Sequence, residues 1–253
     1  MSVTERFERA EAALDREYRQ TGAELDALEA FLDEVGALSP ATDISVSGPS
    51  GVRLQSASTT GLDAVREAYE STMMAVPHFE EEYGESYAEH VRMELGPDVA
   101  TLLTSGQLFG QHHKQVVLAA AHDARMRRAQ LLEAYERERD SLAELSESVC
   151  GITTDTARIE SADFDEQPPS VLDGYHSRVG VLDTRCHELV DRRQSTLVSQ
   201  RRSMSLPITG PDIPTCVYND LDVAYPIVAT CTELLDRLAD LESDLDRRLA
   251  EPA

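Results

Sequence analysis

Apolar side chains recur at alternating spacings of three and four residues along several long stretches of the chain. In residues 2–36 they form one seam: Phe7, Leu14, Tyr18, Thr21, Leu25, Leu28, Leu32 and Val35. This repeat is typical of a long helix that pairs with other long helices. A helix of about 35 residues is roughly 50 Å long, too long to wrap around a compact core. The pattern therefore predicts a bundle.

The same pattern predicts three further long helices. One covers about 107–149 and closes at Cys150-Gly151, with an apolar stripe: Val116, Ala119, Met126, Leu132, Leu142, Leu145 and Val149. Another opens at Pro168-Pro169, because proline is tolerated in a first turn. Its seam is Leu172, Tyr175, Val179, Leu182, Cys186, Leu189, Arg193 and Thr196. The last covers about 227–250, with the seam Ile227, Cys231, Leu234, Leu238, Leu241 and Leu245.

The connecting segments differ in character. Residues 37–60 are rich in Ser, Thr, Gly and Pro, and form either a small β-hairpin around Gly48-Pro49-Ser50-Gly51 or a flexible loop. Residues 61–105 are expected to form shorter helices, broken at Pro77, Gly84 and Gly96-Pro97. The polar residues 151–167 and the proline-punctuated residues 203–226 are expected to be linkers.

We therefore predict an all-α fold: an elongated bundle of long antiparallel coiled-coil-like helices, with an inserted subdomain of short helices. The expected segments of this one domain are 1–36, 37–60, 61–105, 106–150, 151–202 and 203–253.

The charge is strongly one-sided. Lys and Arg number 23 against 47 Asp and Glu, a formal net charge of −24, and Lys114 is the only lysine. Such a carboxylate surface suits multimolar salt, where screening removes the self-repulsion of like charges. It disfavours nucleic-acid binding, which needs a basic surface that releases counterions.

The sequence predicts a cytoplasmic protein. No segment approaches the run of roughly 18 apolar residues that spans a bilayer, and the first residues lack an apolar signal region. The four cysteines show no C-x-x-C spacing, so in a reducing cytosol we expect free thiols: Cys150, Cys186, Cys216 and Cys231.

No catalytic, cofactor or metal motif stands out. Di-iron bundles need Glu-x-x-His on two helices, and only Asp173-x-x-His176 approaches this spacing. The glycine-rich 48–51 stretch lacks the Lys-Ser/Thr of a phosphate loop, and a G-x-S-x-G nucleophile motif is missing. We expect no cofactor and no bound metal.

The least ordinary stretch is residues 73–87, which we call the corner. It combines a proline break with a histidine, several glutamates and three aromatic residues, in a chain with 5% aromatic residues. The candidate interaction residues are His78, Phe79, Glu81, Glu82, Tyr83 and Tyr87. The corner is either a recognition surface or cation pocket, or a structural turn whose aromatic rings anchor it. The structural interpretation is favoured, because aromatic side chains usually supply core area.

Three blocks of sequence resemble a known family. They are Val65–Tyr69 with Pro77–Glu85, then Leu95–Ala100, and finally Val217–Ile227. In this order, between heptad helices, they resemble an uncharacterised haloarchaeal family of unknown function, some of whose members carry the label "halo transducer". The resemblance covers nearly the whole chain. It implies a cytoplasmic, haloarchaeal protein and supplies no catalytic residues.

The combined expectation is a non-enzymatic protein that acts through protein–protein contacts or self-association, without nucleic acid or membrane. Long helices with single apolar seams suit the capture of a partner helix. The alternative is a carboxylate- and histidine-based metal binder or enzyme centred on the corner.

Overall fold

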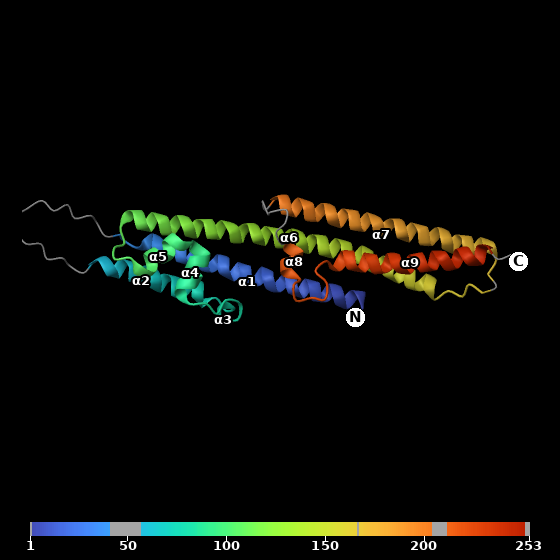
Figure 1. Ribbon diagram of the computed structural model, residues 1–253, viewed down its shortest axis with the longest axis horizontal. Coiled ribbons are helices and arrows are strands. Elements are labelled where there is room, and N and C mark those ends of the chain that lie inside the picture. Colours follow the sequence, from blue (N-terminus) through green and yellow to red (C-terminus); the bar gives the residue numbers. More distant parts are fainter. Residues whose placement is uncertain (1, 41–56, 166, 204–211, 251–253) are drawn as a thin grey trace, which may run out of the picture. The chain divides into compact units, whose positions relative to one another are not determined.

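The computed structural model describes residues 2–40, 57–165, 167–203 and 212–250 (Figure 1). Over these residues the regular structure is helical and contains no strand, so the all-α prediction is confirmed. The suggested hairpin around residues 48–51 lies outside the described residues.

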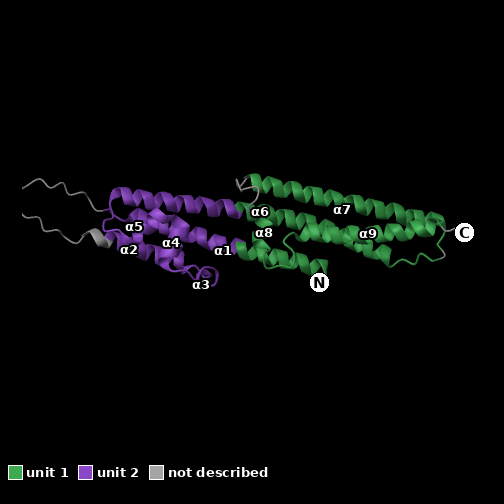
Figure 2. Ribbon diagram, viewed as in Figure 1, with its two compact units in different colours: residues 1–17, 133–253 green, residues 18–132 purple. Residues whose placement is uncertain are grey.

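Four long helices dominate the chain: α1 (Val3–Ala37), α6 (Gln111–Glu160), α7 (Pro169–Ser203) and α9 (Pro226–Ala250). The shorter ones are α2 (Ala57–Thr72), the 3-10 turn η1 (Met73–Ala75), α3 (Phe79–Glu82), α4 (Tyr87–Leu95), α5 (Pro97–Ser105) and α8 (Ile213–Val217). Two compact units share these elements (Figure 2). Unit 1 comprises residues 1–17 and 133–253, and unit 2 comprises residues 18–132.

Unit 2 has one apolar core built from α1, α2, α4, α5 and the first part of α6. Its most deeply buried side chains include Leu28, Phe31, Val65, Tyr69, Val91, Leu103 and Val117. Helix α2 passes so close to Phe109 that a Cβ added at Gly61 would lie 2.9 Å from the Phe109 Cβ. A side chain at position 61 would therefore force the two segments apart.

The expected breaks among the short helices are present. Chain reversal at Gly84 and Gly96 uses positive φ angles of 54° and 91°, a conformation that favours glycine. Ser86 and Glu89 form a capping box at the start of α4, and Pro97 opens α5. These local signals explain why α4 and α5 fold back on each other.

In unit 1, α7 packs along α9 (Figure 1). The predicted seams face inward: Leu182, Cys186 and Leu189 on α7, and Cys231, Leu234 and Leu238 on α9, are all buried. Helix α7 begins at Pro169, as proline's tolerance of a first turn predicted. Most positions of both seams are thus confirmed, whereas the predicted members Tyr175, Thr196 and Leu241 are half-buried.

Helix α6 differs from its predicted form in two ways. It continues through Gly151 to Glu160, although the sequence suggested an end at Cys150-Gly151. Glycine within a helix costs about 1 kcal/mol, whereas burying each of Ile152 and Ile159 contributes about 2 kcal/mol. The predicted stripe in its first part is also wrong: Met126 is 52% exposed, and the buried positions are Val117, Ala121 and Ala124.

Among the described residues, no helix is both long enough and apolar enough to cross a bilayer.

Candidate functional site

A buried carboxylate, Glu24, is the centre of a polar cluster in unit 2. It lies on α1 and receives side chains from the corner: the Tyr83 hydroxyl donates to Glu24 Oε1 over 2.6 Å. His78 Nε2 lies 3.0 Å from the same oxygen. The histidine is 8% exposed, so the corner directs it into the protein.

Arg128 of α6 completes the cluster from the other side. Its Nε donates to Glu24 Oε2 over 2.5 Å, and its Nη2 donates to Glu94 Oε2 over 2.8 Å. We call Glu24, His78, Tyr83, Glu94 and Arg128 the Glu24 cluster. It joins α1, the corner, α4 and α6, and occupies both oxygens of Glu24 with protein donors.

The pKa values follow from this geometry. Burial by itself raises the pKa of Glu24, but the Arg128 charge and the hydrogen bonds from Tyr83 and His78 outweigh it. The Glu24 pKa therefore lies below its usual value, and the carboxylate stays ionised. Burial, reinforced by the bond to Glu24, raises the pKa of Tyr83. Tyr83 is thus a hydrogen-bond donor and not a base.

A second histidine, His90 of α4, lies beside this cluster. Its Nδ1 is 2.8 Å from the Tyr69 hydroxyl, and the Phe79 and Tyr83 rings pack on it with centroid distances of 4.9 and 5.1 Å. Burial lowers its pKa, and nearby Glu94, Glu85 and Glu24 offset this only in part. His90 is therefore held neutral within an aromatic shell.

The structure separates the six candidate residues of the corner into two groups. His78, Phe79 and Tyr83 turn inward, and the half-buried Tyr87 packs edge-on against Tyr69. Glu81 and Glu82 are exposed, and Glu82 accepts a hydrogen bond from Gln20. The six residues therefore do not converge on one pocket. Within the described parts of the chain, no three His, Cys, Asp or Glu side chains are grouped to hold a metal ion.

Unit 1 contains a separate buried cluster around Glu138 of α6. Arg193 of α7 donates to both of its oxygens, over 2.6 and 3.0 Å, and the Tyr218 hydroxyl donates over 2.9 Å. Gln200 and Ser141 complete this Glu138 cluster through bonds to Glu138 and Arg193 respectively. Glu138 and Arg193 are 0% and 1% exposed, so water does not reach either group.

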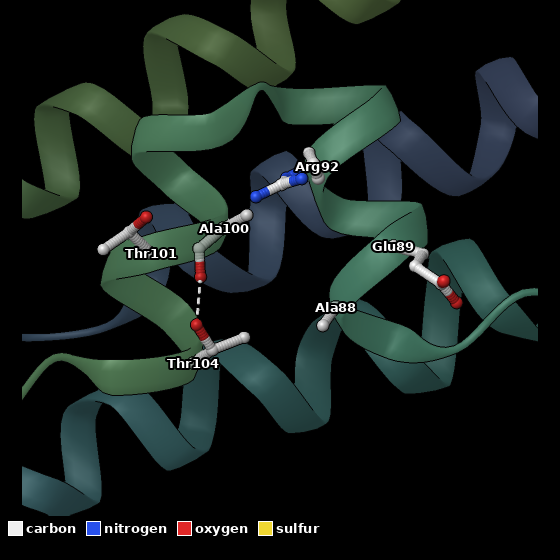
Figure 3. Close-up of a pocket in the computed structure, with 6 residues that line it drawn as sticks. All are labelled: Ala88, Glu89, Arg92, Ala100, Thr101 and Thr104. Carbon is white, nitrogen blue, oxygen red and sulfur yellow. Dashed lines mark hydrogen bonds between the residues drawn. The ribbon is translucent and has the colours of Figure 1, made fainter.

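A pocket of about 160 Å³ lies between α4 and α5 (Figure 3). The Arg92 side chain extends across it, whereas the Glu89 carboxylate turns away toward its bonds with Ser86. The hydroxyls of Thr101 and Thr104 donate to helix carbonyls. The lining thus offers one cationic group and no activated nucleophile.

Sequence reasoning missed the centres of both clusters. Glu24 resembles any solvent-facing glutamate of a helix, and its partner Arg128 is about 100 residues away. Arg193 did give a signal, because it occupies a position in the apolar seam of its helix. A charged residue at such a position indicates a buried partner.

The fold and these clusters define an all-α protein whose long helices are joined by buried, internally paired charges. The chain belongs to the family described as domain of unknown function (DUF7260), whose model matches residues 5–242. This match agrees with the resemblance to a family of unknown function. Comparisons with curated proteins and with solved structures find no match.

Proposed function

We propose that this chain is a non-enzymatic protein that acts by binding another protein chain, either a distinct partner or a second copy of itself. One observation supports this most strongly: the central carboxylates of the Glu24 and Glu138 clusters bond to other protein side chains. Both oxygens of Glu24 and both oxygens of Glu138 are taken by protein donors. Catalysis would need such groups to face a substrate.

We infer that the contact surface is the outer side of the corner. Its inner side is fixed by Phe79 in the core and by His78 and Tyr83 on Glu24. This anchoring presents Glu80 and Glu81, both exposed, on a short rigid element. Preorganised surfaces bind with a smaller loss of conformational entropy.

We further propose that the protein works in the cytoplasm of a halophilic archaeon. The excess of 47 acidic over 23 basic residues and the single lysine support this. Screening by salt weakens repulsion among exposed carboxylates. The melting temperature should therefore rise steadily as KCl increases from about 0.1 M to multimolar concentrations. A melting temperature that stays level or falls over this range would contradict the halophilic origin.

The binding proposal is tested with paired charge variants. Glu80→Gln/Glu81→Gln removes two charges from the corner, and Glu147→Gln on α6 removes another exposed carboxylate as a control. Purified protein in multimolar KCl is sized by light scattering, and proteins that co-purify from a native lysate are identified by mass spectrometry. We expect an assembly or a defined partner that the corner variant loses and the control keeps. A monomer of 27.9 kDa without any specific partner contradicts the proposal.

The metal-binding or enzymatic alternative lacks a comparable observation. It required the corner's carboxylates and a histidine to converge, and the exposed positions of Glu81 and Glu82 remove two of its expected ligands.

A further inference from the structure

Two cysteines face each other inside unit 1. Cys186 lies on α7 and Cys231 on α9, and both side chains are 0% exposed. The two thiols are neighbours across the helix pair, and each alters the pKa of the other. Their neighbours along the two seams, Leu182, Leu189 and Leu234, are buried apolar side chains. The pair therefore occupies a dry contact between two helices that pack along each other.

The other two cysteines have different surroundings. Cys150 is partly exposed on α6, and Cys216 is exposed on α8. A thiol without a neighbouring thiol is oxidised to oxygen acids or forms a link to another molecule. A thiol in contact with a second thiol has an intramolecular route to a disulfide.

We propose that Cys186 and Cys231 form a redox-responsive pair, which a peroxide converts into a disulfide that links α7 to α9. Both sulfurs are buried in the contact between α7 and α9, so a local movement of these helices can bring them to a bonded separation of about 2.05 Å. The linkage would close a loop of about 45 residues that includes α8. It would thereby fasten the segment that carries Tyr218, a donor to Glu138.

One of the two thiols must ionise and attack first. Its neighbour Cys231 lowers the pKa of Cys186, so we assign the first attack to Cys186. Its sulfur bonds to one oxygen of hydrogen peroxide, the O–O bond breaks, and the leaving hydroxide takes the released proton to form water. The Cys231 sulfur then attacks the sulfenic sulfur. The S–S bond forms, the S–O bond breaks, and the Cys231 proton leaves with the hydroxide as a second water. Two thiols lose two electrons, and the peroxide gains them.

The burial of Cys186 and Cys231 limits when the pair can be oxidised. Peroxide reaches the sulfurs only when α7 and α9 separate locally, so a mild denaturant should accelerate oxidation. Once formed, the disulfide opposes that separation. The pair would thus record oxidative exposure by holding the two helices together, independently of the proposed binding role.

The test uses the full chain with Cys150→Ser and Cys216→Ser, which leaves only the pair. The chain is treated with hydrogen peroxide, alkylated under denaturing conditions and weighed. We expect a loss of about 2 Da, no alkylation, reversal by a reducing agent, and a rise in melting temperature of more than about 5 °C. The matched control adds Cys186→Ser. It should gain about 16 Da or multiples of it and show no rise in melting temperature.

A second measurement guards against a variant that fails to fold. Peptide mapping of the oxidised wild-type chain should recover a cross-linked peptide that contains Cys186 and Cys231. The proposal is overturned if both thiols stay alkylatable in mild denaturant, if each gains oxygen instead, or if the links form between chains.

Discussion

Arg193 and Glu138 form a two-pronged ion pair in the interior of unit 1, with side chains that are 1% and 0% exposed. Arg193 occupies a position in the apolar seam of α7, and Glu138 lies on α6. A pair buried this completely adds little stability compared with well-packed apolar residues, but neither charge tolerates the loss of the other. We therefore expect the pair to favour the packing in which this face of α7 meets α6.

Removal of one partner should be costly. Arg193→Met leaves the Glu138 carboxylate buried without its cation, so we expect a loss of about 3 to 5 kcal/mol in the free energy of unfolding. Arg192→Met is the control, because Arg192 is 55% exposed and pairs with the exposed Glu144. It should cost less than about 1 kcal/mol. Urea unfolding measures the free energy of unfolding of both variants. Equal losses would show that Arg193 is not a buried partner of Glu138.

Two glycines provide a matched test of packing in unit 2. Gly61→Ala places a Cβ 2.9 Å from the Phe109 Cβ and should cost about 1 to 3 kcal/mol. At Gly22 of α1 nothing lies within 4 Å of an added Cβ. Gly22→Ala should therefore raise the free energy of unfolding by about 0.5 to 1 kcal/mol, through helix propensity. The predicted opposite signs can be read from thermal or urea unfolding, and the same sign at both sites would contradict the packing.

His90 should make unit 2 sensitive to mild acid. Its pKa is lowered in the folded state by burial, against the partial opposition of Glu94, Glu85 and Glu24. Between that lowered value and the unfolded value of about 6.5, the unfolded chain binds the additional proton. The stabilisation that comes from neutral His90 is therefore fully present above about pH 6.5. The free energy of unfolding falls as the pH drops below that value.

The variant His90→Gln removes this titration and keeps an acceptor for Tyr69. The free energy of unfolding should then depend less steeply on pH between about 6.5 and 5 than in the wild type. The exposed His112→Gln is the control and should keep the wild-type dependence. An unchanged slope in His90→Gln would show that His90 titrates as it does in the unfolded chain.

Glu24 should control a second, more acidic step. Its folded pKa is below the ordinary 4.5, because the stabilising Arg128 charge and the bonds from Tyr83 and His78 outweigh burial. The stabilisation is thus fully present above about pH 4.5 and is lost as the pH falls through the folded value. Glu24→Gln should cost about 2 kcal/mol at pH 7, and its difference from the wild type should shrink below pH 4.5. Unfolding at a series of pH values checks this, and a difference that persists in acid would assign the effect to packing alone.

The spacing of apolar residues could predict the long helices, because it depends only on residues that are close together in the sequence. The seam from Leu172 to Arg193 faces inward as predicted, and so does the seam from Ile227 to Leu245. The Glu24 cluster could not be predicted, because its stability comes from residues on four separate elements. On α1, the buried positions include Glu24 and Phe31, whereas the predicted Leu25 and Leu32 are only half-buried. Hydrophobicity alone predicts that Glu24 is exposed. It is buried because Arg128, distant in the sequence, lies beside it in the fold.

The corner shows the same limit at shorter range. Its aromatic residues were expected to anchor it, and Phe79 lies in the core of unit 2. No sequence pattern indicated that His78 and Tyr83 would share one oxygen of Glu24. These bonds leave the glutamates of α3 as the corner's outward-facing charges.

Complex formation through the corner is the property that decides whether the protein has the proposed binding role. Wild type, Glu80→Gln/Glu81→Gln and the control Glu147→Gln are sized by light scattering in multimolar KCl, with mass spectrometry of co-purifying proteins. We expect a mass well above 27.9 kDa, or one defined partner, for the wild type and the control, and a loss of that complex in the corner variant. A 27.9 kDa monomer without a partner in all three samples, or a complex that the corner variant retains, would contradict this role.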